Sequence, residues 1–224
     1  MIDVLRVGRE AQPVVVIDDF APDPDALRTA ALATSFGPAA HHYPGIRADL
    51  PATYLADQLP KMAKAIAHIL DDGGVTVIGA SFSIVTHAPE NLSVQQRLPH
   101  CDAFDRGRIA LVHYLAQDNA DGTAFFRHRS TGFETVDRSR STIYLDQLDA
   151  ELRHGGPPAP GYVTGDTSLF ERIALVEARY NRAVIYPSWL LHSGAIGPDT
   201  DLSSDPATGR LTVTAFLSVG DGHG

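Results

Sequence analysis

Three side chains of the types that bind hard divalent metals occur at a spacing that lets them meet. His100 and Asp102 are separated by one residue, and in an extended chain residues i and i+2 point to the same face. His192 follows the apolar run RAVIYPS, in the segment WLLHSG, and can supply a third ligand. Two histidines and one carboxylate on one side of a metal form a facial triad, which leaves three positions open. The sequence therefore predicts a metal site.

A single arginine supplies the second chemical signal. Arg210 begins the run RLTVTAFLSV, in which alternation places Arg210, Thr212 and Thr214 on one face and apolar side chains on the other. An arginine that points inward among threonines needs an anionic partner, and its planar fork suits a carboxylate. That partner is either a structural Asp or Glu or the carboxylate of a ligand, and the spacing alone leaves both open.

The order of five short motifs resembles that of the Fe(II)/2-oxoglutarate-dependent dioxygenases, in particular their prolyl-hydroxylase-like branch. In that family an H-x-D motif is followed by a strand ending in Tyr-Leu, a Gly-rich turn into an aromatic strand, a distal His, and Arg-x-Thr or Arg-x-Ser. The corresponding segments here are HCD, LVHYLA, DGTAFF, LLHSG and RLTV. The resemblance covers roughly residues 81–219, and the opening VVVIDDFAPDPDAL also resembles the segment that precedes the core in that branch.

The resemblance implies that His100, Asp102 and His192 bind Fe(II) and that Arg210 binds the distal carboxylate of 2-oxoglutarate. It also implies two further co-substrate contacts, Tyr114 and Thr212. The implied reaction uses O2 to oxidise a C–H bond, most simply by hydroxylation, and releases succinate and CO2. The expected substrate is an amino acid, a peptide or protein side chain, or another small metabolite. Because Asp102 is present, the chain does not resemble the related halogenases, which lack this carboxylate.

Two other classes of protein remain as alternatives. A cupin-like metal enzyme that does not use 2-oxoglutarate would need no Arg210, and cupins usually carry more histidines around the metal. A jelly-roll binding module without catalytic activity would have no reason to keep all three ligands. Detection of succinate in the presence of Fe(II) and 2-oxoglutarate would separate these classes.

Four other residues near these motifs could be functional or structural. Arg127 and Arg129 begin a long insertion and are either a solvated basic edge or a rim that attracts a carboxylate-bearing substrate. Cys101, between two predicted ligands, is expected to face away from the metal as a small buried hydrophobe. His113 alternates with Tyr114 and should also face away from the metal.

The elements that position these residues follow from the periodicity of the chain. From residue 74 onward, short β-rich runs separated by turns predict a mainly β fold with flanking helices, a double-stranded β-helix of the jelly-roll or cupin-like kind. Before it, a short strand is followed by a helix with Leu27, Ala30 and Ala31 on one face. A second helix is expected over 52–70, with a stripe of Leu55, Leu59, Met62, Ile66 and Ile69.

These elements predict one domain over residues 1–224. Residues 1–73 should pack a strand and helices on the core, and residues 74–219 should form the β-helix. An insertion at about 130–168 carries one predicted helix, STIYLDQLDAELRH, and the turn-rich GGPPAPG. It is either a lid over the metal or a segment that packs outside or at a dimer contact. In the second case the substrate-binding surface should lie near His41, Tyr43 and Arg47.

Composition limits the partners and the compartment. The net charge of −9 opposes binding to nucleic acid or anionic lipid, and no apolar run approaches the roughly 18 residues of a membrane span. The single cysteine rules out an internal disulfide framework. We expect a cytoplasmic protein with a small-molecule or peptide substrate, no nucleic-acid or membrane partner, and a homodimer as one open alternative.

Overall fold

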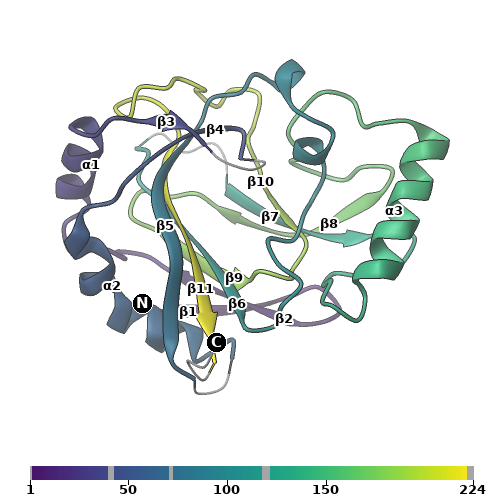
Figure 1. The fold of residues 1–224 in the computed structure, drawn as a ribbon, viewed down its shortest axis with the longest axis horizontal. Coiled ribbons are helices and arrows are strands. Elements are labelled where there is room, and N and C mark those ends of the chain that lie inside the picture. Colours follow the sequence, from purple (N-terminus) through teal and green to yellow (C-terminus); the bar gives the residue numbers. More distant parts are fainter. Residues whose placement is uncertain (1, 40–42, 71–72, 118–121, 221–224) are drawn as a thin grey trace.

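The computed structural model describes all residues except 1, 40–42, 71–72, 118–121 and 221–224. Strands dominate it and form two antiparallel sheets (Figure 1). The strands are β1 (Ile2–Val7), β2 (Gln12–Ile17), β3 (Gly37–Pro38), β4 (Gly45–Ala48), β5 (Val75–Val85), β6 (Arg108–Tyr114), β7 (Gly122–His128), β8 (Phe170–Glu177), β9 (Ala183–Pro187), β10 (His192–Gly194) and β11 (Leu211–Val219). The helices are α1 (Pro24–Leu32), α2 (Ala52–Ile66) and α3 (Ser141–Gly155), with short 3-10 turns at Pro89–Asn91 and Gln95–Arg97.

The chain alternates between the two sheets in the manner of a jelly roll. The larger sheet has the order β1-β2-β9-β6-β11-β5-β4-β3, so β5, β11, β6 and β9 form its centre. The smaller sheet has the order β10-β7-β8, and a bridge between His100 and His192 adds the segment before β6 to its edge. Each sheet thus contributes four neighbouring segments, and among these neighbours β7 and β8 alone are consecutive strands. The predicted double-stranded β-helix is confirmed.

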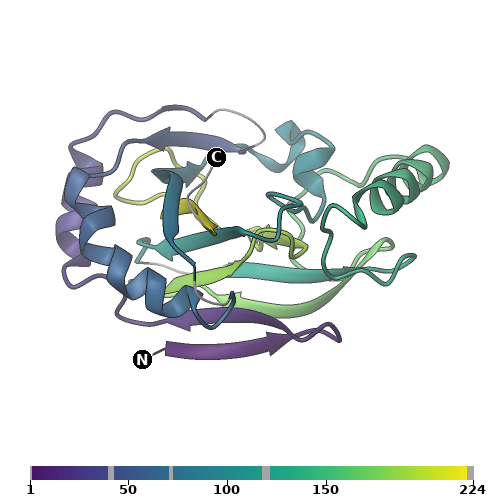
Figure 2. The ribbon, with the colours of Figure 1, turned by 60° about the horizontal axis from the view of Figure 1, so that its bottom comes forward.

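The N-terminal elements extend and cover the larger sheet. The β1–β2 hairpin pairs with β9 at one edge, and β3 and β4 pair with β5 at the other. Helices α1 and α2 lie on one side of the sheet (Figure 2). Their buried residues share one core with the strands, which includes Ala31, Met62, Ile66, Ile109, Leu111, Ile185, Val213 and Ala215. None of the helices in the described residues is long and apolar enough to cross a membrane.

Helix α2 differs from the predicted helix in its end and in its buried face. It ends at Ile66 instead of continuing to residue 70, and residues 67–69 form a turn. Of the predicted stripe, Met62 and Ile66 are buried and Leu55 and Ile69 pack partly buried against the same core, and Tyr54 and Gln58 are buried in addition. The reason is a polar contact that periodicity of apolar residues cannot predict, because the Tyr54 hydroxyl lies 3.1 Å from Nδ1 of His113 inside the core.

Helix α3 of the predicted insertion packs on the outside of the smaller sheet. Tyr144 is buried and Leu148 and Leu152 are partly buried against Ala124 and Phe126 of β7. Phe125, between these two strand residues, belongs instead to the core between the sheets. Both faces of β7 are therefore covered, which explains why every residue of that strand is buried.

Candidate metal centre

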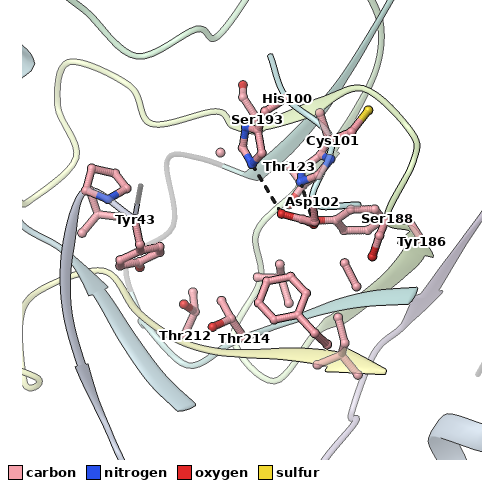
Figure 3. A pocket seen from close by; sticks show the side chains of 18 of the residues that line it. Tyr43, His100, Cys101, Asp102, Thr123, Tyr186, Ser188, Ser193, Thr212 and Thr214 are labelled. Atoms are coloured by element: carbon pink, nitrogen blue, oxygen red, sulfur yellow. Dashed lines mark ion pairs between the residues drawn. The ribbon is translucent and has the colours of Figure 1, made fainter. Parts of the chain in front are cut away.

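Backbone pairing brings the three predicted metal ligands together. The main chains of His100 and His192 exchange two hydrogen bonds of 2.9 Å, so their imidazole rings lie side by side with centroids 4.5 Å apart. The amide of Asp102 donates to the carbonyl oxygen of Ser188 at 2.9 Å. This bond holds the Asp102 carboxylate next to both rings (Figure 3). The ligand atoms of the three side chains all lie within 4.8 Å of one another.

The distances within this triad suit one small cation. Nε2 of His100 lies 3.6 Å from Oδ1 of Asp102, and Nε2 of His192 lies 3.4 Å from Oδ2. Two ligands at about 2.1 Å from a metal and at a right angle are separated by about 3 Å. Small side-chain movements would therefore complete the coordination.

The hydrogen bond on the far side of His192 supports the same reading. Nδ1 of His192 donates to the carbonyl oxygen of Leu190 at 2.8 Å, as the second ring nitrogen of a metal-binding histidine usually does. In the neutral ring, Nε2 then carries a lone pair that faces a carboxylate oxygen of Asp102. Two lone pairs at this distance need a cation between them, either a proton or a metal ion. The donor set and the orientation of His192 thus fit a divalent metal.

The electrostatics of the site favour the charged forms of both groups. Burial alone would raise the pKa of Asp102, but the charge and hydrogen bond of His192 and the charges of His100 and Arg47 lower it below its usual range. Burial alone would lower the pKa of His192, but the Asp102 carboxylate and the Leu190 carbonyl raise it. Asp102 is therefore a carboxylate that attracts a cation at neutral pH.

The triad faces a cavity of about 660 Å³ between the two sheets. The side chain of His192 is 5% exposed, that of Asp102 is 18% exposed and that of His100 is 52% exposed, so His100 forms the open side of the triad. Tyr43 and Thr212 lie across the cavity from Asp102 (Figure 3). Other lining residues include Arg47, Thr123, Tyr162, Tyr186, Ser188, Arg210, Thr214 and Phe216. The cavity is large enough to admit small organic ligands beside the triad.

Arg210, directly before β11, and Thr212, within β11, both line this cavity, as their alternation predicted. Thr214 joins them, whereas Leu211, Val213 and Ala215 are buried in the core under the helices. The Arg210 guanidinium donates to the carbonyl oxygen of Gly122 at 3.4 Å. Its central carbon lies 5.7 Å from the centre of the Tyr114 ring. Arg210 is thus placed against a ring and a backbone carbonyl, at the wall of the cavity.

Tyr114 and Tyr43 differ in their relation to the cavity. Tyr114 is buried beneath Arg210, its hydroxyl is hydrogen-bonded to Thr123 Oγ1 at 2.6 Å, and it is not among the residues that line the cavity. Tyr43 does line it, with its hydroxyl near Thr212 and Ser83 but without a well-formed hydrogen bond to any described residue. Burial raises the pKa of Tyr43, although the charges of Arg210 and Arg47 oppose the rise. Of the two phenols, Tyr43 is therefore the one that faces the cavity.

Comparison with known proteins identifies the family of the chain. The model of a family of unknown function, DUF6445, matches residues 1–217. The chain belongs to this family. None of the curated proteins matches it.

Solved structures with a similar chain path are distant in sequence from this DUF6445 protein. HygX from Streptomyces hygroscopicus, solved with nickel, 2-oxoglutarate and hygromycin B, is 10% identical, with 92% of this chain and 82% of that chain covered and a TM-score of 0.49. A 2OG-Fe(II) oxygenase family oxidoreductase from Burkholderia pseudomallei is 10% identical, with 92% and 84% covered and a TM-score of 0.46. EctD from S. alaskensis with bound Fe is 12% identical, with 96% and 73% covered and a TM-score of 0.45. Similarity at this level does not assign a reaction.

The predicted basic rim at Arg127 and Arg129 is not supported by their positions in this DUF6445 protein. Arg127 is buried and donates to Glu134 at 2.8 Å and to Glu171 at 2.7 Å. Arg129 pairs with Asp166 at 2.9 Å. Neither arginine lines the cavity, and acidic neighbours already neutralise both charges. The sequence could not show this, because Asp166 and Glu171 reach the arginines from the far end of the insertion.

The insertion touches the cavity only through its last part. Tyr162 and Val163 line the cavity, and the Tyr162 hydroxyl donates to the carbonyl oxygen of His87 at 2.8 Å. Helix α3 itself contributes no lining residue and packs on the outer sheet face.

Cys101 packs against the cluster of apolar side chains beneath helix α3, and its thiol donates to the carbonyl oxygen of Trp189. His41, which was predicted to lie near an alternative substrate-binding surface, is outside the described residues.

Sequence reasoning missed one aromatic side chain beside the triad. The Tyr186 ring lies 4.7 Å from the His192 ring, and Phe125 packs against its other side at 5.3 Å. Alternation in β9 does separate Tyr186 from Ala183 and Ile185, which belong to the core under the helices. That signal was present, but both faces of β9 are apolar, so nothing in the run identified the face that meets the metal ligands.

Proposed function

We propose that this protein is an Fe(II)- and 2-oxoglutarate-dependent oxygenase that hydroxylates a C–H bond of an amino acid, a peptide or protein side chain, or a small metabolite. The observation that carries the proposal is the convergence of His100, Asp102 and His192 on one side of an internal cavity. Two imidazoles and one carboxylate leave the cavity-facing positions of a metal open for a co-substrate and oxygen.

Each group of residues has a separate task in this proposal. His100, Asp102 and His192 would hold the metal, which when bound activates O2 while 2-oxoglutarate is converted to succinate and CO2. Arg210 would bind the distal carboxylate of 2-oxoglutarate through its fork, with Tyr43 as a hydroxyl donor and Thr212 beside them in the cavity wall. The rings of Tyr186 and Phe125 pack behind His192 and exclude water from that side of the ligand.

The test of this proposal is succinate formation by the purified protein with Fe(II), ascorbate and 2-oxoglutarate under air. We expect slow, iron-dependent succinate release without added substrate, because such enzymes turn over the co-substrate when uncoupled. The variant Asp102→Ala should lose it by at least about a hundredfold, since the metal then lacks its only charged protein ligand. Asp146→Ala, an exposed residue of α3, is the control and should keep the wild-type rate.

Two outcomes would contradict the proposal. Metal binding with no consumption of 2-oxoglutarate would favour a cupin-like enzyme of another kind. Failure to bind any divalent metal would favour a binding module.

A further inference from the structure

The cavity carries more positive charge than one co-substrate carboxylate requires. Arg47, Arg108 and Arg210 all line it, and among its described lining residues Asp102 is the one carboxylate. This excess of cationic side chains occurs in a chain whose net charge is −9. A positively lined cavity in an acidic protein attracts anions and concentrates them at the site.

Arg47 is the cavity arginine with a buried donor that no described residue satisfies. It belongs to β4, where it pairs with Ser83 of β5, and its guanidinium carbon lies 4.6 Å from the centre of the Tyr43 ring. Its Nε is buried and has no hydrogen-bond partner in the described part of the chain. No carboxylate of a described residue lies within 4.0 Å of it. By contrast, the buried Arg127 is paired with two glutamates.

A purely structural role for Arg47 explains these contacts poorly. Stacking on Tyr43 would hold the guanidinium plane, but it satisfies none of the N–H groups. A buried donor without a partner costs stability, and such groups in native structures usually await a ligand, water or ion.

We infer that Arg47, supported by the Tyr43 ring, binds a carboxylate of the organic substrate, at a position separate from the co-substrate carboxylate bound by Arg210. The inference rests on the proposed function, because it assigns Arg210 to 2-oxoglutarate. One carboxylate of 2-oxoglutarate lies at the metal and the other at Arg210, so Arg47 remains for a different anion. The fork of Arg47 suits a planar carboxylate.

The rest of the cavity indicates the body of that substrate. Apolar residues form much of the wall, among them Ile78, Leu98, Val112, Ile196 and Phe216. A ligand that fills the cavity would bury an aliphatic or aromatic portion there. The substrate class is therefore a small organic acid with an apolar body.

The experiment is a binding screen by saturation-transfer NMR. The protein is loaded with Zn(II) in place of iron and with saturating 2-oxoglutarate, and is offered aliphatic and aromatic carboxylic acids, each paired with its primary amide. We expect acids to bind at least about tenfold more tightly than their amides, as for a charge-assisted hydrogen bond. Arg47→Gln should remove this preference, Arg47→Lys should keep part of it, and the exposed Arg138→Gln should keep all of it.

Three results would overturn the inference. They are equal binding of acids and amides, an undiminished preference in Arg47→Gln, and a loss of 2-oxoglutarate affinity in Arg47→Gln as large as in Arg210→Lys. The last would mean that Arg47 serves the co-substrate. The same screen without metal and 2-oxoglutarate separates this inference from the proposed function: an Arg47-dependent preference for acids in a protein that never consumes 2-oxoglutarate would reject the oxygenase and retain the anion site.

Discussion

At the scale of single residues, the co-substrate pocket depends on the geometry of one guanidinium. Arg210 is held between the Tyr114 ring and the Gly122 carbonyl, which fixes the direction of its fork. Arg210→Lys keeps the charge but loses the two parallel donors, so the apparent affinity for 2-oxoglutarate should fall by about tenfold or more. Calorimetric titration of the metal-loaded protein measures this, and metal affinity should be unchanged. Unchanged 2-oxoglutarate affinity would remove Arg210 from this role.

Two tyrosines near Arg210 provide a matched pair of variants. Tyr43→Phe removes a hydroxyl that faces the cavity, so the apparent KM for 2-oxoglutarate should rise by about three- to tenfold with little change in stability. Tyr114→Phe removes a buried hydroxyl bonded to Thr123, so it should lower the free energy of unfolding by about 1 kcal/mol and leave KM nearly unchanged. Steady-state kinetics and urea unfolding of both variants check this, and the opposite assignment would restore Tyr114 to the pocket.

The sequence predicted the site residues that lie close to one another along the chain. His100 and Asp102 are one residue apart, and Arg210 shares a strand face with Thr212, so strand geometry alone places each pair. Tyr43 and Arg47 could not be placed in the same way. They reach the cavity because β4 pairs with β5, across a separation of about forty residues that no local pattern encodes.

At the scale of elements, the insertion is tied down at both ends of α3. Before the helix, Asp137 accepts hydrogen bonds from the Ser139 hydroxyl and amide at 2.6 and 2.9 Å and pairs with Arg106 at 2.7 Å. Toward its end, Glu151 lies 2.8 Å from Nε2 of the buried His128. The helix itself was predictable from its periodicity. The sequence did not show which sheet face this helix covers, because β7 carries a phenylalanine on each face, Phe125 on one and Phe126 on the other.

The turn before α3 should contribute stability that depends on pH. The Ser139 hydrogen bonds and the Arg106 charge lower the pKa of Asp137 to about 2. Its stabilising effect is therefore present above the unfolded value of 3.8 and lost as the pH falls through about 2. Asp137→Asn should destabilise the protein by about 1 kcal/mol at pH 6, and this difference should shrink between pH 4 and 2. Thermal unfolding measures it, with Asp146→Asn as control; a difference that does not depend on pH would contradict the assignment.

At the scale of the whole molecule, one buried histidine joins three parts of the fold. Oδ1 of Asn181 already accepts from the amide of Ala21, so Nε2 of His113 must donate to it, at 3.0 Å. Nδ1 then accepts from the Tyr54 hydroxyl at 3.1 Å. The neutral ring thus links the β6 strand, helix α2 and the turn before β9. The expectation that His113 faces away from the metal is confirmed, whereas its partners lie too far along the chain to be predicted.

This network makes global stability sensitive to mild acid. Burial lowers the pKa of His113 to about 4, although the bond to Asn181 opposes this. The unfolded chain therefore takes up a proton that the folded protein excludes, and stability falls as the pH drops from about 6.5 towards 4. Between pH 7 and 5 the wild type should lose about 2 kcal/mol more than His113→Gln, which does not titrate. Urea unfolding at the two pH values measures this, and equal losses would show that His113 does not control the acid response.

The central claim is that the three converging ligands hold iron in a form that accepts 2-oxoglutarate, and an anaerobic titration tests it most directly. The protein is titrated with Fe(II), and 2-oxoglutarate is then added while the visible spectrum is recorded. We predict one bound iron per chain and a charge-transfer absorption that appears only with the keto acid, absent in His192→Ala and unchanged in Asp146→Asn. Iron bound equally well by His192→Ala, or no absorption on addition of 2-oxoglutarate to the iron-loaded protein, would contradict the account.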